Sequence, residues 1–421
     1  MKQPKIRFKG FSGEWETPIV SEVFDIRNGY TPSKNVKEFW EGGTIPWFRM
    51  EDIRENGGIL RDSIQHITPI GVKGNGLFEK NSIILATTAT IGVHAMLIAD
   101  SLANQRFTNF SIRKSLSDKY FSYFVYYAFY RIDEWSKMNT NSGGLLSVNI
   151  PLLLKQPFYT PSIREQKVIT SYFTNLDSLI QSTAKKIDSL KQVKAASLQS
   201  MFPQEGETTP RVRFKGFEGE WEIVPFAKVF SFVKNNSFTR DQLSVSEGEV
   251  KNVHYGDVLI KFGDIIDGKK DCLPYIIGLK QSNKLCQTAL LRDGDIIIAD
   301  AAEDNTVGKC SEMFNINNEY VLSGLHTIAC RPLIIFALGY LGHYMNTDSY
   351  HNQLLPLIQG SKISSISKSA ILQTTIMFPS YAEQQQIASY FTALDSQISL
   401  HSQRLEKLKQ IKSACLDNMF V

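Results

Sequence analysis

Cysteine is scarce in this sequence, with five among 421 residues, and all five lie in the second half. Their number is odd and no two form a CxxC pair, so neither a disulfide framework nor a zinc site is expected, and a reducing compartment fits. Long apolar runs are also missing, since no stretch approaches the roughly 18 apolar residues of a membrane span. The N-terminus, MKQPKIRFKG, is charged where a signal peptide needs an apolar run. We therefore expect a cytoplasmic protein with no membrane partner.

A strong charge of one sign is also absent. Lys and Arg number 46 against 42 Asp and Glu, so the net charge of +4 is no argument by itself for a polyanionic partner. The hydrophobic fraction of 43% and the charged fraction of 21% are those of a soluble globular protein. A chain of this length can form two or three domains.

Several enzyme signatures are missing. The sequence has no Pro-Pro pair, which excludes the Pro-Pro-aromatic motif of adenine methylases, and it has neither HExxH nor GxSxG. Residues 263–270 have P-loop spacing, but Lys270 stands where Ser or Thr must bind magnesium, and two aspartates would repel phosphates. The acidic cluster of Asp293, Asp295 and Asp300 is more typical of turns beside a strand than of a metal nuclease. We expect no catalytic residues and no metal site.

The chain repeats itself in two places. Residues 4–16 (PKIRFKGFSGEWE) align with residues 210–222 (PRVRFKGFEGEWE), with ten of thirteen positions identical. Residues 161–203 align with residues 379–421, with 21 of 43 positions identical. Between these blocks lie two inserts, 17–160 and 223–378, that have diverged almost beyond alignment. A repeated frame with unlike inserts suits a protein whose frame binds similar partners while its inserts read different targets. A duplication that merely drifted is the alternative, although drift would have eroded the frame equally.

The second repeated block predicts a long helix in each copy. Each copy has a capping-box pattern, in which Ser caps the helix and Glu takes the third helical position, and then about 36 residues without Gly or Pro. Such a helix measures roughly 50 to 55 Å. The residues of this opening pattern are Pro161, Ser162, Glu165 and Gln166 in the first copy, and Pro379, Ser380, Glu383 and Gln384 in the second.

Apolar residues in both helices follow alternating steps of four and three, which is a coiled-coil seam. Two near-copies in one chain favour packing against each other over packing on separate domains. If they run antiparallel, the two inserts face a duplex as two readers whose spacing the helices fix. His401 at a seam position is interpreted as a packed side chain, and the lysine-rich faces as solvated flanks. The predicted seam residues are Leu176, Ile180, Ile187, Leu190, Leu394, Ile398, Leu405 and Leu408.

Both inserts mix short β-branched runs with glycine-rich turns, which predicts α/β (α+β) domains with exposed polar loops. Buried strands are expected at residues 82–92 and 295–300, and helices near 119–135 and 334–345. Loops rich in Thr, Asn, Gln, Ser, Arg and Lys match what base-edge and phosphate contacts require, although they are also common on any surface.

A set of motifs in this order resembles the specificity subunits of type I restriction-modification systems. The motifs are Gly29-Tyr-Thr-Pro-Ser33, Phe39-Trp40, Gly43-Thr-Ile-Pro-Trp47, the strand and loop at 83–92, Asn104-Gln105, and the Pro-x-x-x-Glu-Gln start of each helix. The resemblance covers nearly the whole chain. The second insert departs from it, because it lacks the Thr-Pro-Ser and Ile-Pro-Trp segments, and Val253-His-Tyr-Gly-Asp257 looks like another subtype of reader.

The resemblance implies a fold of two target-recognition domains separated by two helices in an antiparallel coiled coil, with a pseudo-two-fold repeat. The expected division is 1–160 for the first domain, 161–203 for the first helix, 204–378 for the second domain and 379–421 for the second helix. It implies a non-catalytic, sequence-specific subunit that reads a bipartite double-stranded DNA target with a non-specific gap.

The implied partners are two modification subunits, which methylate adenine, and restriction subunits that translocate and cut DNA. No cofactor is expected in this chain, with S-adenosylmethionine, ATP and magnesium expected in the partner subunits. The alternatives are a self-contained DNA enzyme, a coiled-coil scaffold with no role on nucleic acid, and a DNA-binding module of a different DNA-modifying system. A methylase or nuclease core needs more chain than either insert offers.

The predicted DNA-contacting residues lie in the polar loops of the two inserts. In the first insert they are Tyr30, Thr31, Lys34, Arg49, Thr87, Thr88, Thr90, Gln105, Arg106, Asn139, Asn141 and Ser142. In the second they are Asn305, Thr306, His326, Gln359, Ser361 and Lys362.

Overall fold

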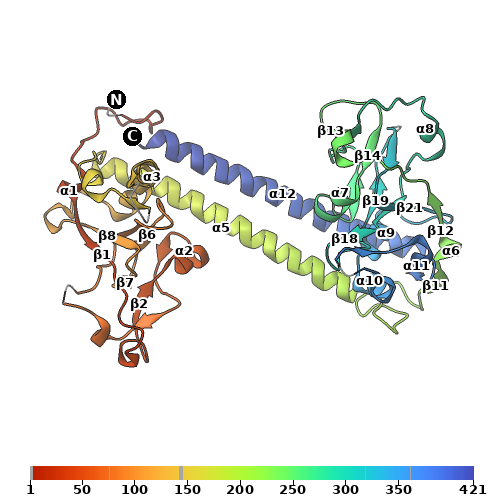
Figure 1. Ribbon diagram of the computed structural model, residues 1–421, viewed down its shortest axis with the longest axis horizontal. Helices are drawn as coiled ribbons and strands as arrows, with labels where there is room; N and C mark the ends of the chain where they lie inside the picture. The colour runs from red at the N-terminus through yellow and green to blue at the C-terminus, as the bar shows by residue number, and fades with distance from the viewer. Residues whose placement is uncertain (1–2, 75, 142–145, 318, 361) are drawn as a thin grey trace. The chain divides into compact units, whose positions relative to one another are not determined.

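The computed structural model describes residues 3–74, 76–141, 146–317, 319–360 and 362–421 (Figure 1). The chain divides into two compact units. Unit 1 comprises Met1–Ala184 with Gln403–Val421, and unit 2 comprises Lys185–Ser402. Each unit therefore contains one insert, the first half of the long helix that follows it, and the second half of the other long helix. Within the described ranges, no helix combines the length and the apolarity that crossing a membrane requires.

Unit 1 is built on a five-stranded sheet with the order β1-β8-β5-β6-β3. All neighbours in it are antiparallel except β3 and β6, which are parallel. A smaller sheet has the order β4-β2-β7, and β9 pairs with β10. The strands are β1 Phe24–Asn28, β2 Ile45–Phe48, β3 Ile59–Leu60, β4 His66–Ile67, β5 Ile83–Ala86, β6 His94–Leu97, β7 Leu102–Ala103, β8 Phe107–Ile112, β9 Thr140–Asn141 and β10 Ser147–Val148. The helices of this insert are α1 Val20–Val23, α2 Met50–Asn56, α3 Ser122–Met138 and α4 Ile150–Leu153.

The central strand β5 is buried along its whole length. Its sequence, Ile-Ile-Leu-Ala, has apolar side chains on both faces because α3 packs against one face and the small sheet against the other. The predicted strand at 82–92 is thus confirmed for its first part, and the rest of that stretch is a loop.

Unit 2 repeats this architecture although its sequence has diverged. Its main sheet has the order β12-β21-β17-β19-β15, again with one parallel pair, β15 with β19. Further sheets are β13-β16-β14-β20, β11-β23 and β18-β22. The strands are β11 Glu222–Pro225, β12 Phe230–Val233, β13 Leu243–Ser244, β14 Lys251–Val253, β15 Ile265–Asp267, β16 Tyr275–Ile276, β17 Ile296–Ala299, β18 Ala301–Ala302, β19 Cys310–Phe314, β20 Val321–Ser323, β21 Thr327–Pro332, β22 Ser364–Ser365 and β23 Thr375–Phe378. The helices are α6 Phe226–Val229, α7 Tyr255–Ile260, α8 Lys284–Thr288, α9 Tyr340–Tyr344, α10 Asp348–Leu354 and α11 Lys368–Ile371.

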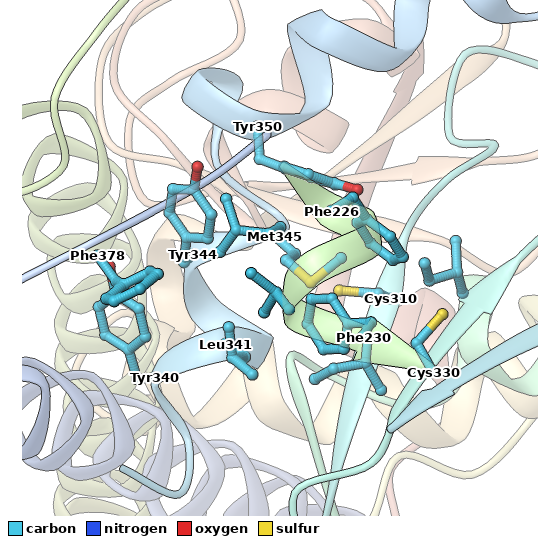
Figure 2. Close-up of a cluster of buried hydrophobic side chains, with 14 of the residues drawn as sticks. Phe226, Phe230, Cys310, Cys330, Tyr340, Leu341, Tyr344, Met345, Tyr350 and Phe378 are labelled. Atoms are coloured by element: carbon cyan, nitrogen blue, oxygen red, sulfur yellow. The ribbon is translucent and has the colours of Figure 1, made fainter. Parts of the chain in front are cut away.

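The core of unit 2 is dominated by aromatic side chains packed on the main sheet (Figure 2). Tyr340, Tyr344 and Tyr350 are fully buried. Cys310 and Cys330, on the two strands β19 and β21 that flank β17, lie among them, and all five cysteines of the chain are free thiols. Here cysteine acts as a small apolar residue, and burial raises the pKa of the Cys330 thiol well above its usual range.

The two long helices are α5, Ile163–Ser200, and α12, Tyr381–Met419. In unit 1 the Tyr172 hydroxyl of α5 lies 3.3 Å from the Cys415 thiol of α12, and Asp177 lies 2.5 Å from Lys412. The residue numbers of the paired positions increase along α5 while they decrease along α12, so the two segments run antiparallel. In unit 2 the pairs are Lys194 with Asp395 at 2.6 Å, and Ser197 with Tyr390 at 2.9 Å, with the same polarity. The predicted antiparallel pairing is confirmed.

The predicted seam residues lie along this contact. Leu176, Ile187 and Leu190 are buried, and Ile180, Leu394, Ile398, Leu405 and Leu408 are half-buried, as is His401.

One predicted helix is wrong in its extent. The stretch 334–345 forms only the five-residue helix α9, because Gly339 adopts φ +90° and ends the preceding segment in a left-handed turn. Leu333, Ile334 and Ile335 ahead of it are exposed at 58%, 41% and 84%. The helix near 119–135 is confirmed as α3.

Candidate nucleic-acid interface

The repeated N-terminal motif holds the start of each long helix through one arginine. In unit 1 the Arg7 guanidinium donates two hydrogen bonds to the Glu165 carboxylate, at 2.7 and 2.8 Å, and a third to the Gly13 carbonyl. In unit 2 Arg213 makes the same contacts with Glu383, both at 2.7 Å, and with Gly219. The bonds to the carboxylates raise the pKa of both arginines.

This contact corrects the expected capping box. The Ser162 hydroxyl does accept a bond from the Glu165 backbone N–H, at 3.4 Å. The carboxylate of Glu165, however, binds Arg7 and does not return to the helix start. A glutamate at the third helical position can serve either partner, and the bidentate guanidinium is the stronger one.

The glutamine after each glutamate holds the insert. The Gln166 amide nitrogen donates to the Lys119 carbonyl, at 2.9 Å, and its oxygen accepts from the Phe121 N–H, at 2.8 Å. In unit 2 the Gln384 oxygen accepts from the Ala337 N–H at 3.1 Å. The Glu-Gln pair thus holds the repeated N-terminal motif and the insert together, and it does so in both units.

The predicted residues of the first insert that the structure describes come together in one surface, here called loop cluster 1 and made of residues 29–34, 47–49, 87–90, 103–106, 139–141 and 146–148. Four backbone N–H···O bonds join these segments: Tyr30 to Ala103, Asn104 to Phe48, Thr87 to Arg106, and Val148 to Thr87, all between 2.9 and 3.0 Å. The loops are therefore a single connected surface at the ends of the sheet strands.

Lys34 is the most strongly positioned cation in loop cluster 1. Its ammonium lies 3.5 Å from the centre of the Trp40 ring and 4.7 Å from that of Trp47, and it donates to the Gln65 amide oxygen at 3.0 Å. Burial, followed by the charge of Arg49, lowers the pKa of Lys34. Lys34 and Arg49 therefore place two positive charges close together.

Some of the other predicted residues of unit 1 are exposed, and some form hydrogen bonds within the unit. Gln105 and Arg106 are exposed, and the Gln105 side chain bonds the Thr31 hydroxyl at 2.5 Å. Tyr30 is half-buried and its hydroxyl contacts Gly71. Thr87 is buried, with its hydroxyl 3.2 Å from that of Thr108.

The remaining positions lie at the edge of the cluster. Thr88 and Thr90 are half-buried, and the Asn139 amide donates to the Trp135 carbonyl. Asn141 is exposed. Ser142 and Ser361 lie outside the described residues.

Unit 2 builds an equivalent surface, loop cluster 2, from residues 235–240, 252–257, 300–306, 323–326, 359–360 and 362–366. The same four kinds of backbone bond join its segments: Asn236 to Ser323, Gly324 to Val253, Asp300 to His326, and Ile366 to Asp300, between 2.8 and 3.1 Å. Pairing of β18 with β22, and of Gln359 with Ser365, brings in the last loop. The predicted residues Asn305, Thr306, His326, Gln359 and Lys362 are all exposed in or beside these segments.

Sequence reasoning missed part of loop cluster 2. Because Phe48 and Val253 accept equivalent bonds, Arg49 of unit 1 corresponds to His254 of unit 2, and each is the residue before a helix, α2 or α7. His254 is buried, and burial followed by the charge of Arg240 lowers its pKa. Arg240 itself makes a bidentate bond to Asp257, at 2.6 and 2.9 Å. The sequence signal for this part is the segment 253–257, which is unlike the first insert.

Two aspartates of the acidic cluster, Asp293 and Asp295, form hydrogen bonds within the protein. Asp295 is fully buried and pairs with Arg331 through two bonds, at 2.9 and 2.6 Å. Asp293 accepts from the Ile316 N–H. Residues 265–267 of the P-loop-like stretch form strand β15, and residues 268–270 after it form a turn without a helix behind it.

A buried charged group lies where unit 2 meets the helices. Oxygen and nitrogen atoms of Asp264, His343 and Asp395 lie within 4.8 Å of one another, which is spacing that could hold a metal ion. The Lys194 ammonium, however, lies 2.7 Å from Asp264 and 2.6 Å from Asp395, so a cation of the chain itself takes that place. Burial alone would raise the pKa of Asp264, but the bond from His343 and the charge of Lys194 lower it to about 2.

Comparison with known proteins adds a family and a fold. A family model described as the type I restriction modification DNA specificity domain matches residues 12–192 and 218–410. The EcoprrI specificity subunit of Escherichia coli is 49% identical over 141 residues, which are 34% of this chain and 35% of that subunit. The MjaIX specificity subunit of Methanocaldococcus jannaschii is 27% identical over 202 residues, covering 45% of this chain and 44% of that subunit. These two matches thus span less than half of each relative's length.

A third relative matches along most of its length. The MjaVIII specificity subunit of Methanocaldococcus jannaschii is 20% identical over 415 residues, covering 96% of this chain and 91% of that subunit. Among solved structures, a type I restriction-modification S subunit from M. genitalium has a TM-score of 0.58 at 14% identity, covering 100% of this chain and 99% of that one. A chain from a study of assembly and conformational transition of the type I R-M system has a TM-score of 0.55 at 14% identity, covering 96% and 97%. At these identities the two structures show the fold. Because the family model matches both halves of the sequence, this chain belongs to the family of type I restriction-modification DNA specificity domains.

Proposed function

We propose that this chain is the DNA-reading specificity subunit of a type I restriction-modification complex and that it reads a bipartite target. The observation that carries the proposal is the pair of loop clusters, which share their backbone bonds but differ in their side chains. Constant backbone with variable side chains is what two readers of different half-sites need. The family consists of non-catalytic subunits, with the activities of the complex in other subunits.

We assign the readers to residues 1–160 and 204–378, and the spacer helices to residues 161–203 and 379–421. Unbroken helices support a role in setting the unread gap, since α5 has 38 residues and α12 has 39. Shortening both helices by one heptad is expected to change the gap that is tolerated. An unchanged gap preference would argue against this role.

We propose that the frame docks two modification subunits, one on each copy. Three exposed residues recur identically at equivalent positions on one face of each helix: Ser171, Thr174 and Ser178 of α5, and Ser389, Thr392 and Ser396 of α12. Exposed side chains that face solvent contribute little to the fold of the chain itself, so their identity in both copies favours a shared partner. Restriction subunits would complete the complex in the cytoplasm, and S-adenosylmethionine, ATP and magnesium would bind the partner subunits.

The decisive test maps methylated adenines across the genome in cells with and without this chain. We expect methylation at one bipartite sequence, and only when the chain is present. Exchanging insert 17–160 for that of another family member should change one half-site and leave the other as it was. Methyl transfer to DNA by the purified chain alone would overturn the assignment in favour of a self-contained enzyme.

A scaffold without a nucleic-acid role makes a different prediction. Gel retardation of random and target duplexes by the complex should show binding that weakens with salt, because cations at Lys34, Arg49 and Arg106 would displace counterions from phosphates. A scaffold would retard neither duplex.

A further inference from the structure

Residues 106 and 326 occupy the same place in the two readers. Each directly precedes the longest strand of its sheet, β8 or β21. Each also accepts, through its backbone carbonyl, from the residue directly after the central strand: the Thr87 N–H donates to Arg106 at 2.9 Å, and the Asp300 N–H donates to His326 at 3.1 Å. These shared bonds place the two residues at equivalent positions of the two readers, although of the two only His326 has a positive φ.

Arg106 presents hydrogen-bond donors. The residue is exposed, its backbone N–H is taken by the Asn104 side chain at 3.0 Å, and its guanidinium has no partner within the described part of the chain. A guanidinium has five donors and no acceptor. In the major groove its matching pair of acceptors is O6 and N7 of guanine.

His326 presents an acceptor. Its Nδ1 lies 3.2 Å from the Asp300 carboxylate, which can only accept, so Nδ1 donates to it, and in the neutral form of the ring Nε2 keeps a free lone pair. The ring also packs edge-on against Tyr255 at 5.3 Å, and its backbone has φ +54°. A left-handed histidine is strained, and such strain concentrates at functional sites. The side chain is 52% exposed, so the fixed acceptor is accessible.

We propose that Arg106 and His326 are equivalent specificity-determining residues of opposite hydrogen-bond polarity. The inference rests on the proposed DNA-reading function. Arg106 reads a guanine in the half-site of unit 1. His326, oriented by Asp300 and Tyr255, accepts from the exocyclic amino group of adenine or cytosine in the half-site of unit 2. The two halves of the target therefore differ in kind at this position.

The experiment selects bound sequences from a randomised duplex library with the chain in complex with its modification subunits. Arg106→Ala is expected to reduce the preference for guanine at one position of the first half-site about tenfold or more. His326→Gly removes the acceptor and relieves the positive φ, so folding is not at risk, and it should abolish the preference for adenine or cytosine at one position of the second half-site. His326→Arg should convert that position to guanine, and the wild-type selection itself distinguishes adenine from cytosine.

Lys9→Ala and Lys215→Ala are matched controls, because both lysines are exposed at equivalent places in the frame. They should leave both half-sites unchanged. A wild-type complex that selects a bipartite target, together with Arg106→Ala and His326→Gly variants that keep its base preferences, would overturn this inference alone. A wild-type complex that selects no sequence would overturn the proposed function as well.

Discussion

Units 1 and 2 share their frame and sheet order, yet they differ in how deeply charged side chains are buried next to the long helices. In unit 1 the helix pair Asp177 and Lys412 is about one-third exposed on each side chain. In unit 2 the equivalent pair, Asp395 and Lys194, is extended inward by Asp264 and the fully buried His343. The residues with which an insert contacts the long helices can thus differ between the units while the contacts within the repeated frame, such as Arg7 with Glu165, are kept.

A second difference lies on the main sheet. Met96 of β6 pairs with Ile83 of the central strand, and Glu312 of β19 pairs with the corresponding Ile296. Both side chains are buried, so a thioether in unit 1 is replaced by a carboxyl group in unit 2. Glu312 accepts from the N–H groups of Gly339 and Gly342, both at 2.8 Å, which ties β19 to α9. The fold tolerates a buried acid because backbone donors satisfy it.

The largest expected effect tests what the units share. Arg7→Ala should destabilise unit 1 by about 3 kcal/mol, because it leaves the buried Glu165 carboxylate without its bidentate partner. Arg213→Ala should do the same to unit 2 through Glu383. Urea unfolding measures both, with Trp221 as the single tryptophan of unit 2 and the other four in unit 1.

The control for this pair is Lys9→Ala in the same motif, which should change stability by less than about 0.5 kcal/mol because the side chain is exposed. Losses below about 1 kcal/mol in both arginine variants would mean that the frame is not held by these pairs.

The second prediction concerns pH and unit 2 alone. Burial raises the pKa of Glu312 to about 7, so the folded state keeps a proton that the unfolded state loses above pH 4.5. The contribution of Glu312 to the free energy of unfolding should fall by roughly 3 kcal/mol as pH rises from 4.5 to 7, and it should not change further at higher pH. Glu312→Gln should remove this slope, although it costs stability at every pH because the amide can satisfy only one of the two N–H groups.

The measurement is the difference in urea unfolding between wild type and Glu312→Gln at pH 5 and pH 7.5, followed by Trp221 fluorescence. Taking the difference cancels other titrating groups, including His254, whose lowered pKa works in the opposite direction. A difference that does not change with pH would show that Glu312 is ionised or neutral throughout.

Much of the likeness between the units could be predicted from the sequence, because the frame is a sequence repeat. The duplicated blocks predicted two long helices that pack on each other, the family resemblance implied that they run antiparallel, and β-branched runs predicted the central strands at Ile83–Ala86 and Ile296–Ala299. The loop residues around Tyr30, Gln105 and Arg106 were also named together, and they do lie in one surface.

The rest depends on side chains that meet over long sequence distances. Arg7 and Glu165 are 158 residues apart, and a capping pattern explained the glutamate locally, so the true partner was overlooked. The match of Arg49 with His254 was invisible because the inserts do not align in sequence, and only backbone bonds reveal it. The apolar run at 333–338 overlaps the stretch predicted as a helix, but helix α9 begins only after the turn at Gly339. Phe336 and Ala337 of that run are buried, and its other four residues are exposed.

The third prediction separates the two helix pairs. Lys194→Ala should lower the free energy of unfolding by about 2 kcal/mol. The mostly buried Asp264 carboxylate would lose the ammonium group that pairs with it. Lys412→Ala should cost less than about 1 kcal/mol, because its pair is more exposed. Adding Asp264→Asn to Lys194→Ala should restore part of the loss in unit 2, as measured by Trp221 unfolding. Equal costs for the two lysines would remove the distinction drawn between the units.

The smallest expected effect concerns two tyrosines 218 positions apart. The Tyr390 hydroxyl lies 2.9 Å from the Ser197 hydroxyl, whereas the Tyr172 hydroxyl lies 3.3 Å from the Cys415 thiol. Because a thiol is a weak hydrogen-bond partner, Tyr390→Phe should cost about 1 kcal/mol and Tyr172→Phe less than about 0.5 kcal/mol. Thermal and urea unfolding of the two variants measure the difference.

Cys415→Ser then gives unit 1 the pair that unit 2 has, and should raise the cost of Tyr172→Phe toward that of Tyr390→Phe. If the costs stay unequal in the serine background, the partner atom is not the cause, and the packing around each tyrosine must differ. If they become equal, one sulfur atom accounts for the asymmetry at this point of an otherwise repeated frame.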